Sequence, residues 1–234
     1  MKKILLCGSN SFLGNYIGSE LTKDKNFVIN LARNKNRYKK DNYYKINFNN
    51  ELSIKKKFFQ LKKKYKAIDA VFFIIGNSKK NYLKFPNTSD FHKSFQDNFY
   101  TFVNIFNAYN NVFGINKSNF IIISSIAGIK DIGAPLTYSV AKNSLNFFCS
   151  ALAKNYEKKN FKINVISPGN ILILGNNWSK KIKKDKKSVY EYINNNVPNN
   201  KFCNPVEIYD TCKLLMKENN FLGSNIILDG GQIL

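Results

Sequence analysis

The fold is decided near the start of the chain, by the stretch Ile4-Leu5-Leu6-Cys7-Gly8-Ser9-Asn10-Ser11-Phe12-Leu13-Gly14. The apolar run at residues 4–7 predicts a buried strand, and the apolar residues of 13–22 recur three or four apart, as on one face of a helix. A glycine-rich turn between a strand and a helix lets the backbone approach a dinucleotide pyrophosphate and points the helix N-terminus at it. Because Ser11 and Phe12 replace the interior glycines of that pattern, a plain strand-turn-helix connection stays open as the alternative.

The same alternation of strand and helix continues along the chain. Strands are predicted at residues 4–7, 27–32, 44–48, 70–75, 120–124, 161–166 and 225–228. Helices are predicted at residues 13–22, 54–65, 90–112, 138–156 and 205–217. Because neighbouring parallel strands need crossover helices, this order predicts an α/β Rossmann fold, a doubly wound parallel sheet of about seven strands with helices on both faces.

The chain has 234 residues, of which 44% are hydrophobic, and this fits one compact domain. No internal repeat or low-complexity linker divides it. We therefore expect residues 1–234 to form a single dinucleotide-binding domain. Residues 170–198 are the one long segment that fits neither the strand nor the helix pattern.

The charge of the chain is strongly positive, with 37 Lys and Arg against 15 Asp and Glu and a formal net charge of +22. Only Arg33 and Arg37 are arginines, and the lysines lie scattered in short runs among Asn, Ile and Phe. We interpret this bias as composition filling solvated faces and not as a nucleic-acid-binding stripe. A nucleic-acid partner is therefore not expected.

Cysteine and histidine usage narrows the class of protein further. The four cysteines lack C-x-x-C spacing and lie in apolar runs, which predicts reduced, buried thiols in a cytoplasmic protein. The N-terminal apolar run breaks at Gly8 without a cleavage site, and no apolar stretch approaches the ~18 to 20 residues that span a bilayer. We therefore expect neither a secretory leader nor a membrane span. His92 is the only histidine, so we expect no His-based triad and no metal site.

The end of the second predicted strand carries information on the cofactor. An NAD site usually places an acid there to bind the adenosine ribose 2′-hydroxyl, whereas this chain has Arg33. A guanidinium can pair with a 2′-phosphate, so we predict NADP(H), with NAD(H) as the alternative. A solvated arginine at a strand end, without a cofactor contact, stays open as the alternative.

A tyrosine and a lysine four residues apart, Tyr138 and Lys142, lie on one face of a predicted helix. Tyr209 and Lys213 repeat this spacing, but only the first pair has a serine, Ser125, thirteen residues earlier at a strand end. Reduction of a carbonyl leaves charge developing on its oxygen, so a positioned proton donor lowers the barrier. A neighbouring ammonium favours the phenolate and brings the tyrosine pKa towards the working pH.

Together these features resemble the short-chain dehydrogenases/reductases, in their short-form branch. The motifs fall in the order and spacing of that family over essentially the whole chain: residues 8–14, Asp69-Ala70-Val71, Asn98, Ser124-Ser125, Tyr138-Ser139-Val140-Ala141-Lys142, Ser167-Pro168-Gly169 and Leu228-Asp229-Gly230-Gly231-Gln232.

The resemblance implies a role for each matching residue. Tyr138 would be the catalytic acid, and Lys142 would lower its pKa and hold the nicotinamide ribose. Ser125 would bind the carbonyl or hydroxyl group, and Asn98 would belong to a proton relay. The cofactor would be held by Gly8, Ser9, Asn10, Ser11, Phe12, Leu13, Gly14, Arg33, Asn47, Gly76, Tyr138, Lys142, Pro168 and Gly169. Within this set, Pro168-Gly169 resembles the turn beside the nicotinamide, and Asn47 stands where the family usually has an adenine-contacting Asp.

The chain departs from the family pattern at three places. Cys7 replaces the usual Thr, Phe12 replaces the middle glycine, and Phe73-Ile74-Ile75-Gly76 stands where Asn-Asn-Ala-Gly is usual. The turn is closer to the Gly-x-x-Gly-Phe-x-Gly motif of the longer, epimerase-like branch, which it matches except at Ser11. Because the sequence ends three residues after Gly231, as in the short form, we predict a short-form enzyme with an atypical cofactor loop.

Three functions follow from these observations. The first is an NADP(H)-dependent carbonyl reductase resembling 3-oxoacyl-carrier-protein reductases, which acts on a small-molecule or carrier-linked substrate. The second is an enzyme of the same family that acts on a sugar or nucleotide sugar in polysaccharide or glycan biosynthesis. The third is a non-catalytic dinucleotide-binding or nucleic-acid-binding derivative. For the first two we expect a homodimer or homotetramer.

The family also uses the segment after Pro168-Gly169 to close over its substrate, which here corresponds to residues 170–198. Trp178, the only tryptophan, is either a wall of the substrate site or an anchor for this segment. The lysines of residues 180–187 either attract an anionic substrate or form a solvated surface.

Overall fold

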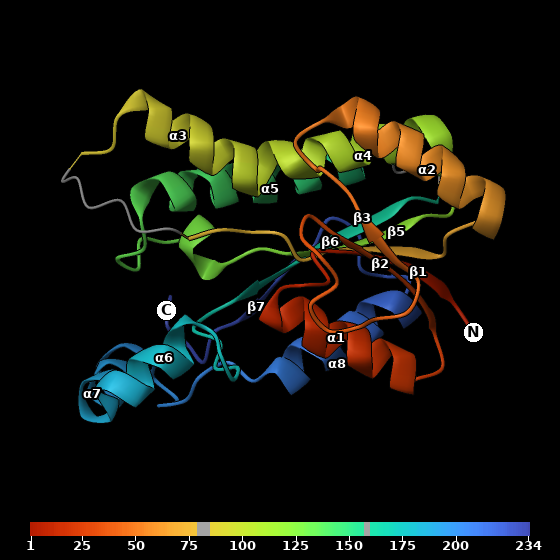
Figure 1. The fold of residues 1–234 in the computed structure, drawn as a ribbon. Coiled ribbons are helices and arrows are strands. Elements are labelled where there is room, and N and C mark those ends of the chain that lie inside the picture. The colour runs from red at the N-terminus through yellow and green to blue at the C-terminus, as the bar shows by residue number, and fades with distance from the viewer. Residues whose placement is uncertain (79–84, 157–159) are drawn as a thin grey trace.

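The computed structural model describes residues 1–78, 85–156 and 160–234. A parallel sheet lies at its centre, in the strand order β3-β2-β1-β4-β5-β6-β7 (Figure 1). The strands are β1 (Lys3–Cys7), β2 (Phe27–Ala32), β3 (Tyr43–Lys45), β4 (Ala70–Phe73), β5 (Asn119–Ile123), β6 (Lys162–Pro168) and β7 (Asn225–Leu228). The predicted doubly wound parallel sheet is thus confirmed.

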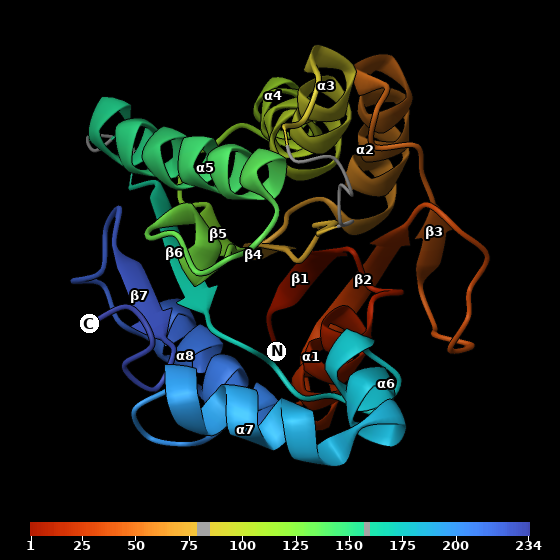
Figure 2. The same ribbon diagram turned by 90° about the vertical axis from the view of Figure 1, so that its left-hand side faces the viewer.

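Helices cover both faces of the sheet. They are α1 (Phe12–Lys23), α2 (Glu51–Tyr65), α3 (Thr88–Phe95), α4 (Thr101–Val112), α5 (Leu136–Asn155), α6 (Asn177–Lys184), α7 (Lys186–Asn196) and α8 (Pro205–Lys217). α2, α3, α4 and α5 lie on one side, and α1 and α8 on the other (Figure 1). The pair α6 and α7 lies on the side of α1 and α8 in both views (Figures 1 and 2).

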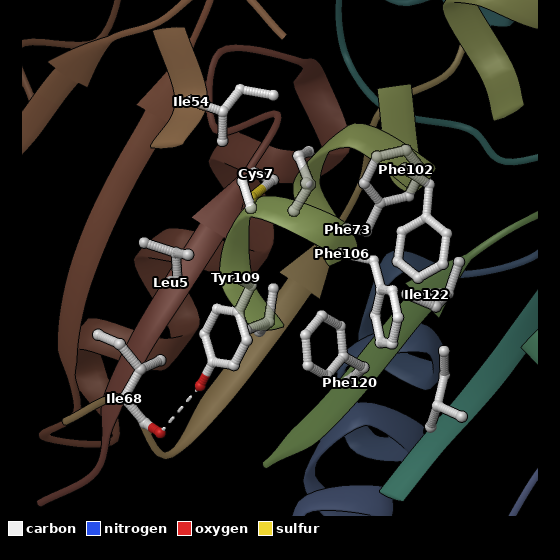
Figure 3. Close-up of a cluster of buried hydrophobic side chains, with 14 of the residues drawn as sticks. Leu5, Cys7, Ile54, Ile68, Phe73, Phe102, Phe106, Tyr109, Phe120 and Ile122 are labelled. Carbon is white, nitrogen blue, oxygen red and sulfur yellow. Dashed lines mark hydrogen bonds between the residues drawn. The ribbon is translucent and has the colours of Figure 1, made fainter. Parts of the chain in front are cut away.

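The core between the sheet and the α2, α4 and α5 side contains a cluster of aromatic rings among aliphatic side chains. Phe73 of β4 meets Phe102 of α4 with ring centroids 5.2 Å apart, and Phe120 of β5 lies 5.1 Å from Tyr109 with the rings nearly perpendicular (Figure 3). Edge-to-face contacts of this kind add to the stabilisation from apolar burial. The buried hydroxyl of Tyr109 hydrogen-bonds with that of Ser118 at 3.2 Å, which satisfies its polar end.

The strand order reverses at β1, which pairs with β2 on one side and β4 on the other. In a doubly wound sheet, the crevice at the carboxyl ends of the strands flanking such a point is where ligands bind. Gly8 follows β1, Gly76 lies shortly after β4, Ser125 follows β5 and Pro168 ends β6. The topology therefore delivers most of the predicted site residues to one edge of the sheet.

Residues 170–198, which fit neither periodic pattern, contain the two short helices α6 and α7. Asparagine and aspartate side chains begin them: the Asn176 Oδ1 accepts from the Ser179 N–H at 3.0 Å, and the Asp185 Oδ1 accepts from the Ser188 N–H at 3.0 Å. The lysine-rich α6 has only eight residues and few apolar ones, so the sequence shows no apolar periodicity that would predict this helix.

Two other predictions needed correction. The helix expected at residues 90–112 contains a π-helical turn, Gln96–Tyr100, between α3 and α4. The strand expected at 44–48 is β3, which ends at Lys45. There the chain leaves the sheet edge for a turn, in which the Asn47 Oδ1 accepts from the Asn49 N–H at 3.1 Å. Asparagine favours such local turns over strand pairing.

The four cysteines, Cys7, Cys149, Cys203 and Cys212, are free and buried, as expected. Within the described part of the chain, no helix combines the length and the apolar character needed to cross a bilayer.

The aromatic core generates a stability prediction. Phe120→Ala removes a fully buried ring that contacts Phe102, Phe106, Tyr109 and Phe161. We expect the free energy of unfolding, measured by urea denaturation, to fall by about 3 to 5 kcal/mol. Phe85→Ala, at an exposed ring, is the control and should change it by less than about 0.5 kcal/mol. A loss below about 1 kcal/mol at Phe120 would contradict this description of the core.

Candidate active site

The turn after β1 is shaped for close approach of two backbone segments. Gly8 has φ +97°, in the left-handed region that favours glycine, and a Cβ atom there would lie 2.6 Å from the Ile74 carbonyl oxygen. A Cβ atom at Gly14 would overlap the Gly8 carbonyl oxygen. Gly8 thus lets the segment after β4 approach the turn, and Gly14 lets the first turn of α1 sit directly on the end of β1.

Ser11 replaces a family glycine without strain. Its backbone is extended, with φ −71° and ψ 161°, and its side chain caps α1. The Ser11 Oγ accepts from the Gly14 N–H at 2.9 Å and donates to the Gly8 carbonyl at 2.9 Å. The hydroxyl therefore stabilises the helix start, at a position where the backbone conformation does not require glycine.

The other side chains of the turn point in different directions. Ser9 is buried, and the Asn10 Nδ2 donates to the Lys35 carbonyl at 2.7 Å. Leu13 packs against an apolar cluster beside the sheet. Phe12 contacts the segment after β6, because a Cβ atom at Gly175 would lie 2.6 Å from its ring. The side chains of Ser9, Asn10, Phe12 and Leu13 are thus engaged in contacts within the protein or buried.

Ser125, Tyr138 and Lys142 come together at the carboxyl ends of β4 and β5. Ser125 begins the 3-10 turn Ile126–Gly128, and its side chain lies close enough to the Tyr138 hydroxyl to lower the pKa of that tyrosine. Lys142 lies one helical turn further along α5, with its Nζ 5.9 Å from the centre of the Tyr138 ring. The sequence pattern of one serine, one tyrosine and one lysine thus corresponds to a real cluster.

Gly128 makes this cluster geometrically attainable, and the sequence analysis did not single it out. A Cβ atom at Gly128 would lie 2.7 Å from the backbone carbon of Lys142. The 3-10 turn therefore presses directly on α5, which brings Ser125 against Tyr138. A lone glycine before a helix carries no local signal of this contact.

The Lys142 amine is buried, with 2% of the residue exposed. Its Nζ donates long hydrogen bonds to the carbonyls of Ile75 and Ile123, at 3.5 and 3.4 Å. Among the described residues, no carboxylate forms an ion pair with this amine. Burial disfavours the charged form and lowers the pKa of Lys142 to about 8.

The pKa of Tyr138 is raised, whereas the sequence analysis expected the Lys142 ammonium to lower it. Burial raises the pKa of Tyr138, and the hydrogen bond from Ser125 offsets only part of that rise. The net direction is upward, because desolvation of the phenolate outweighs the favourable interactions around it. Near neutral pH Tyr138 is therefore a protonated phenol, the form that can donate a proton.

Asn98 lies in the π-helical turn and is fully buried. Its Oδ1 accepts from the Asn77 N–H at 2.8 Å, and its Nδ2 donates to the carbonyls of Asn77 and Ser94 at 3.1 and 3.0 Å. A Cβ atom at Gly76 would lie 3.1 Å from the Lys142 Nζ and 3.3 Å from the Asn98 Oδ1. Asn98 thus holds the loop after β4 against the lysine.

The remaining predicted cofactor residues are spread around the crevice. Arg33 follows β2, and its NH1 pairs with the Asp97 Oδ1 at 3.3 Å. Pro168 ends β6, and the Gly169 N–H donates to the Leu228 carbonyl at 2.9 Å. Asn47 is exposed in the loop before α2, and the hydrogen bond of its side chain is to its own turn.

The second tyrosine-lysine pair has a structural role. The Tyr209 hydroxyl donates to the Asp24 Oδ2 at 2.8 Å and so ties α8 to the end of α1. Burial raises the pKa of Tyr209, and the Asp24 carboxylate raises it further. It lies outside the crevice that holds Ser125, as its lack of a matching serine indicated.

A nicotinamide dinucleotide fits the residues at this edge. The positive φ of Gly8, the start of α1 and the side-chain-free Gly76 form a cradle of backbone. The buried Lys142 amine has three N–H groups and two long bonds to carbonyls, which leaves donor capacity for ribose hydroxyls.

Comparison with known proteins also points to a reductase that binds a nicotinamide cofactor. A family model described as Enoyl-(Acyl carrier protein) reductase matches residues 19–232. Human 3-oxoacyl-[acyl-carrier-protein] reductase is 28% identical over 109 residues, which are 47% of this chain and 42% of that protein. Glucose 1-dehydrogenase 2 of Bacillus subtilis (strain 168) is 29% identical over 122 residues, 50% of this chain and 45% of that protein. Each match thus spans less than half of the curated relative.

Solved structures share the fold over the whole chain. ElxO with NADP bound has a TM-score of 0.87 at 20% identity, with 100% of this chain and 99% of that chain covered. The Pseudomonas aeruginosa RhlG/NADP active-site complex has a TM-score of 0.86 at 20% identity, with 100% and 96% covered. The family match extends over nearly all of the chain and agrees with the motifs and the strand order, so this chain belongs to the short-chain dehydrogenase/reductase family.

Proposed function

We propose that this chain is an NADP(H)-dependent oxidoreductase that interconverts a carbonyl and a hydroxyl group on a small-molecule or carrier-linked substrate. The observation that carries the proposal is the convergence of Ser125 and Tyr138 beside the buried Lys142, whose Nζ lies 5.9 Å from the centre of the Tyr138 ring. Two hydroxyls that meet at one point can bind the same substrate oxygen. The partial match to human 3-oxoacyl-[acyl-carrier-protein] reductase supports carbonyl chemistry.

The residues divide the work on the substrate oxygen. Ser125 donates a hydrogen bond to that oxygen and orients it, and Tyr138 donates its proton to it. The Lys142 ammonium stabilises the phenolate left on Tyr138. Asn98 keeps the loop after β4 in place and belongs to the proposed proton path. The nicotinamide cofactor, when bound, supplies or accepts the hydride.

The same proposal assigns the cofactor contacts. The backbone of residues 8–14 would hold the pyrophosphate, with the start of α1 directed at its charge. Arg33 would meet the 2′-phosphate, and Asn47 the adenine. Gly76, Lys142 and Pro168-Gly169 would surround the nicotinamide ribose and ring.

Residues 170–198 would cover the substrate. Contact of Gly175 with Phe12 places the start of this segment next to the cofactor turn. Trp178 stacks on Tyr192 at 5.4 Å and meets Phe202 at 5.5 Å, and the Lys181 Nζ lies 4.1 Å from its ring centre. These contacts favour Trp178 as an anchor of the segment over a free substrate wall.

A sugar or nucleotide sugar is the second candidate substrate class, favoured by the partial match to Glucose 1-dehydrogenase 2. Absorbance at the nicotinamide band, followed with NADPH and 3-oxoacyl thioesters, keto sugars and simple ketones, or with NADP and aldose sugars, separates the two. Turnover of an acyl thioester supports the first candidate, and turnover of sugars alone supports the second. Binding of NADPH without turnover of any carbonyl compound or sugar would favour the non-catalytic derivative.

The phenol of Tyr138 is the subject of the first functional prediction. Tyr138→Phe removes the proton donor and preserves ring shape, so turnover should fall by about 10²-fold or more while NADPH binding is retained. Tyr209→Phe, at the repeated spacing, should leave turnover within about twofold. Equal loss of activity in both variants, with both folded, would contradict the assignment.

The lowered pKa of Lys142 predicts the pH dependence of carbonyl reduction. Lys142 is charged below its pKa of about 8 and neutral above it, so support for the Tyr138 phenolate is present at low pH and lost as pH rises. We expect kcat/KM for reduction to fall as pH increases through about 8. Lys142→Arg keeps its charge at these pH values, so its profile should fall only at higher pH. An unchanged profile in this variant would exclude Lys142 as the titrating group.

The cofactor preference is testable at Arg33. Loss of a charge-assisted bond to phosphate costs about 1.5 to 3 kcal/mol, so Arg33→Ala should weaken NADPH binding about ten- to a hundredfold. NADH binding should stay within about twofold, because it lacks the 2′-phosphate. Fluorescence titration of both cofactors measures this. Equal affinities of the wild-type protein for NADPH and NADH would refute the preference.

The proposed enzyme works as a homodimer or homotetramer in the cytoplasm. An apolar side chain, Phe147 of α5, is 76% exposed, and Leu136 and Val140 of the same helix are exposed too, which supports burial of this face against a second copy. The four free thiols support a reducing compartment. Light scattering should give at least twice the monomer mass, and Phe147→Lys should lower it. Cell fractionation tests the location.

A further inference from the structure

The arginine expected to meet the cofactor phosphate already has an anionic partner. The Arg33 NH1 lies 3.3 Å from the Asp97 Oδ1, and the two residues are 64 positions apart in the chain. The second carboxylate oxygen, Oδ2, accepts from the Asn77 Nδ2 at 2.9 Å. Asp97 therefore joins three segments: the end of β2, the loop after β4 and the π-helical turn.

This ion pair lies beside the cofactor turn. Two residues before Arg33, the Leu31 carbonyl accepts the Gly8 N–H at 2.9 Å, so the end of β2 is tied to the turn itself. In doubly wound folds, the end of the second strand faces the adenosine ribose of a dinucleotide. Asp97 thus places a carboxylate where β2 has none, next to the cation.

The ion pair between Arg33 and Asp97 is partly exposed, so breaking it costs little free energy. The Arg33 side chain is 47% exposed and that of Asp97 is 26% exposed, and ion pairs of this kind contribute little to stability. A 2′-phosphate carries about two negative charges, so it would compete for the guanidinium and be repelled by the carboxylate left beside it. A 2′-hydroxyl has no charge and can donate a hydrogen bond to that carboxylate.

We propose that Asp97 is a cofactor-specificity residue, which narrows the preference for NADP(H) over NAD(H) by holding Arg33 and by repelling the 2′-phosphate. The proposal rests on the proposed function, since it concerns the cofactor of the same site. Asp97 acts on binding of the adenosine end and has no part in proton transfer.

Asp97→Asn tests this proposal directly. Asparagine keeps the size of the side chain and an oxygen that can accept from Asn77, but removes the charge. One unit charge about 6 Å from a dianion in a water-like dielectric corresponds to about tenfold in affinity. We therefore expect fluorescence titration to show NADPH binding about tenfold tighter and the ratio of NADH to NADPH dissociation constants raised about tenfold.

Two further variants control the measurement. Asp210→Asn removes a carboxylate that pairs with Lys213 at 2.9 Å on α8, and should leave the ratio within twofold. In an Arg33→Ala background, Asp97→Asn should raise NADPH affinity by less than it does in the wild type, because there is no guanidinium to release. Melting temperatures of the cofactor-free variants, within about 2 °C of wild type, show that the π-helical turn is preserved.

The outcomes separate this inference from the proposed function. A ratio that is unchanged within twofold, or lowered, in Asp97→Asn would overturn the role of Asp97 while leaving cofactor binding intact. An equal gain from Asp97→Asn with and without Arg33 would overturn the part of the proposal in which Asp97 holds Arg33, since only the repulsion of the 2′-phosphate would then remain. Failure of the wild-type protein to bind either cofactor would instead refute the proposed function.

Discussion

The Lys142 amine sits in the interior at the carboxyl edge of the sheet, and the elements around it are arranged to tolerate it. A buried ammonium costs free energy unless polar groups compensate. Here the carbonyl of Ile123, at the end of β5, and that of Ile75, in the loop after β4, accept from the amine at 3.4 and 3.5 Å. Gly76 leaves the space beside it free of a side chain, and Asn98 fastens the loop that carries Gly76. The end of β5 and the loop after β4 thus supply the carbonyl oxygens that compensate the buried amine.

The same constraint explains the opposite behaviour of the two titratable groups. Burial lowers the pKa of Lys142 and raises that of Tyr138, so both move towards their neutral forms. A protonated phenol next to an amine whose pKa is about 8 suits proton donation to a substrate oxygen near neutral pH. Ser125 offsets part of the rise in the Tyr138 pKa, so in the proposed mechanism it would affect proton transfer as well as substrate orientation.

Departures from the family pattern are locally compensated. Ser11 occupies an extended conformation open to any residue, and its hydroxyl caps α1 in place of the missing glycine. Phe12 fills the position of a second glycine and packs against the segment around Gly175. The Phe12 ring takes up space in the turn that a glycine would leave free, and it contacts the segment proposed to cover the substrate.

Local patterns in the sequence determined the element order, because apolar period and helix-capping residues act over a few neighbouring positions. The strands at residues 27–32 and 225–228 and the helix at 205–217 match the structure at both ends. The four-residue spacing of Tyr138 and Lys142 likewise required only helix geometry. Residues 170–198 escaped prediction because α6 and α7 are short and rich in lysine and asparagine.

Tertiary structure decided which of these residues meet. Tyr209 and Lys213 have the same spacing as Tyr138 and Lys142, yet Tyr209 bonds to Asp24, 185 residues away. The contact of Gly128 with Lys142 and the pairing of Arg33 with Asp97 also join separate elements. Such contacts depend on strand order and helix placement across the whole sheet, and no local sequence pattern encodes the distance between two side chains brought together by that packing.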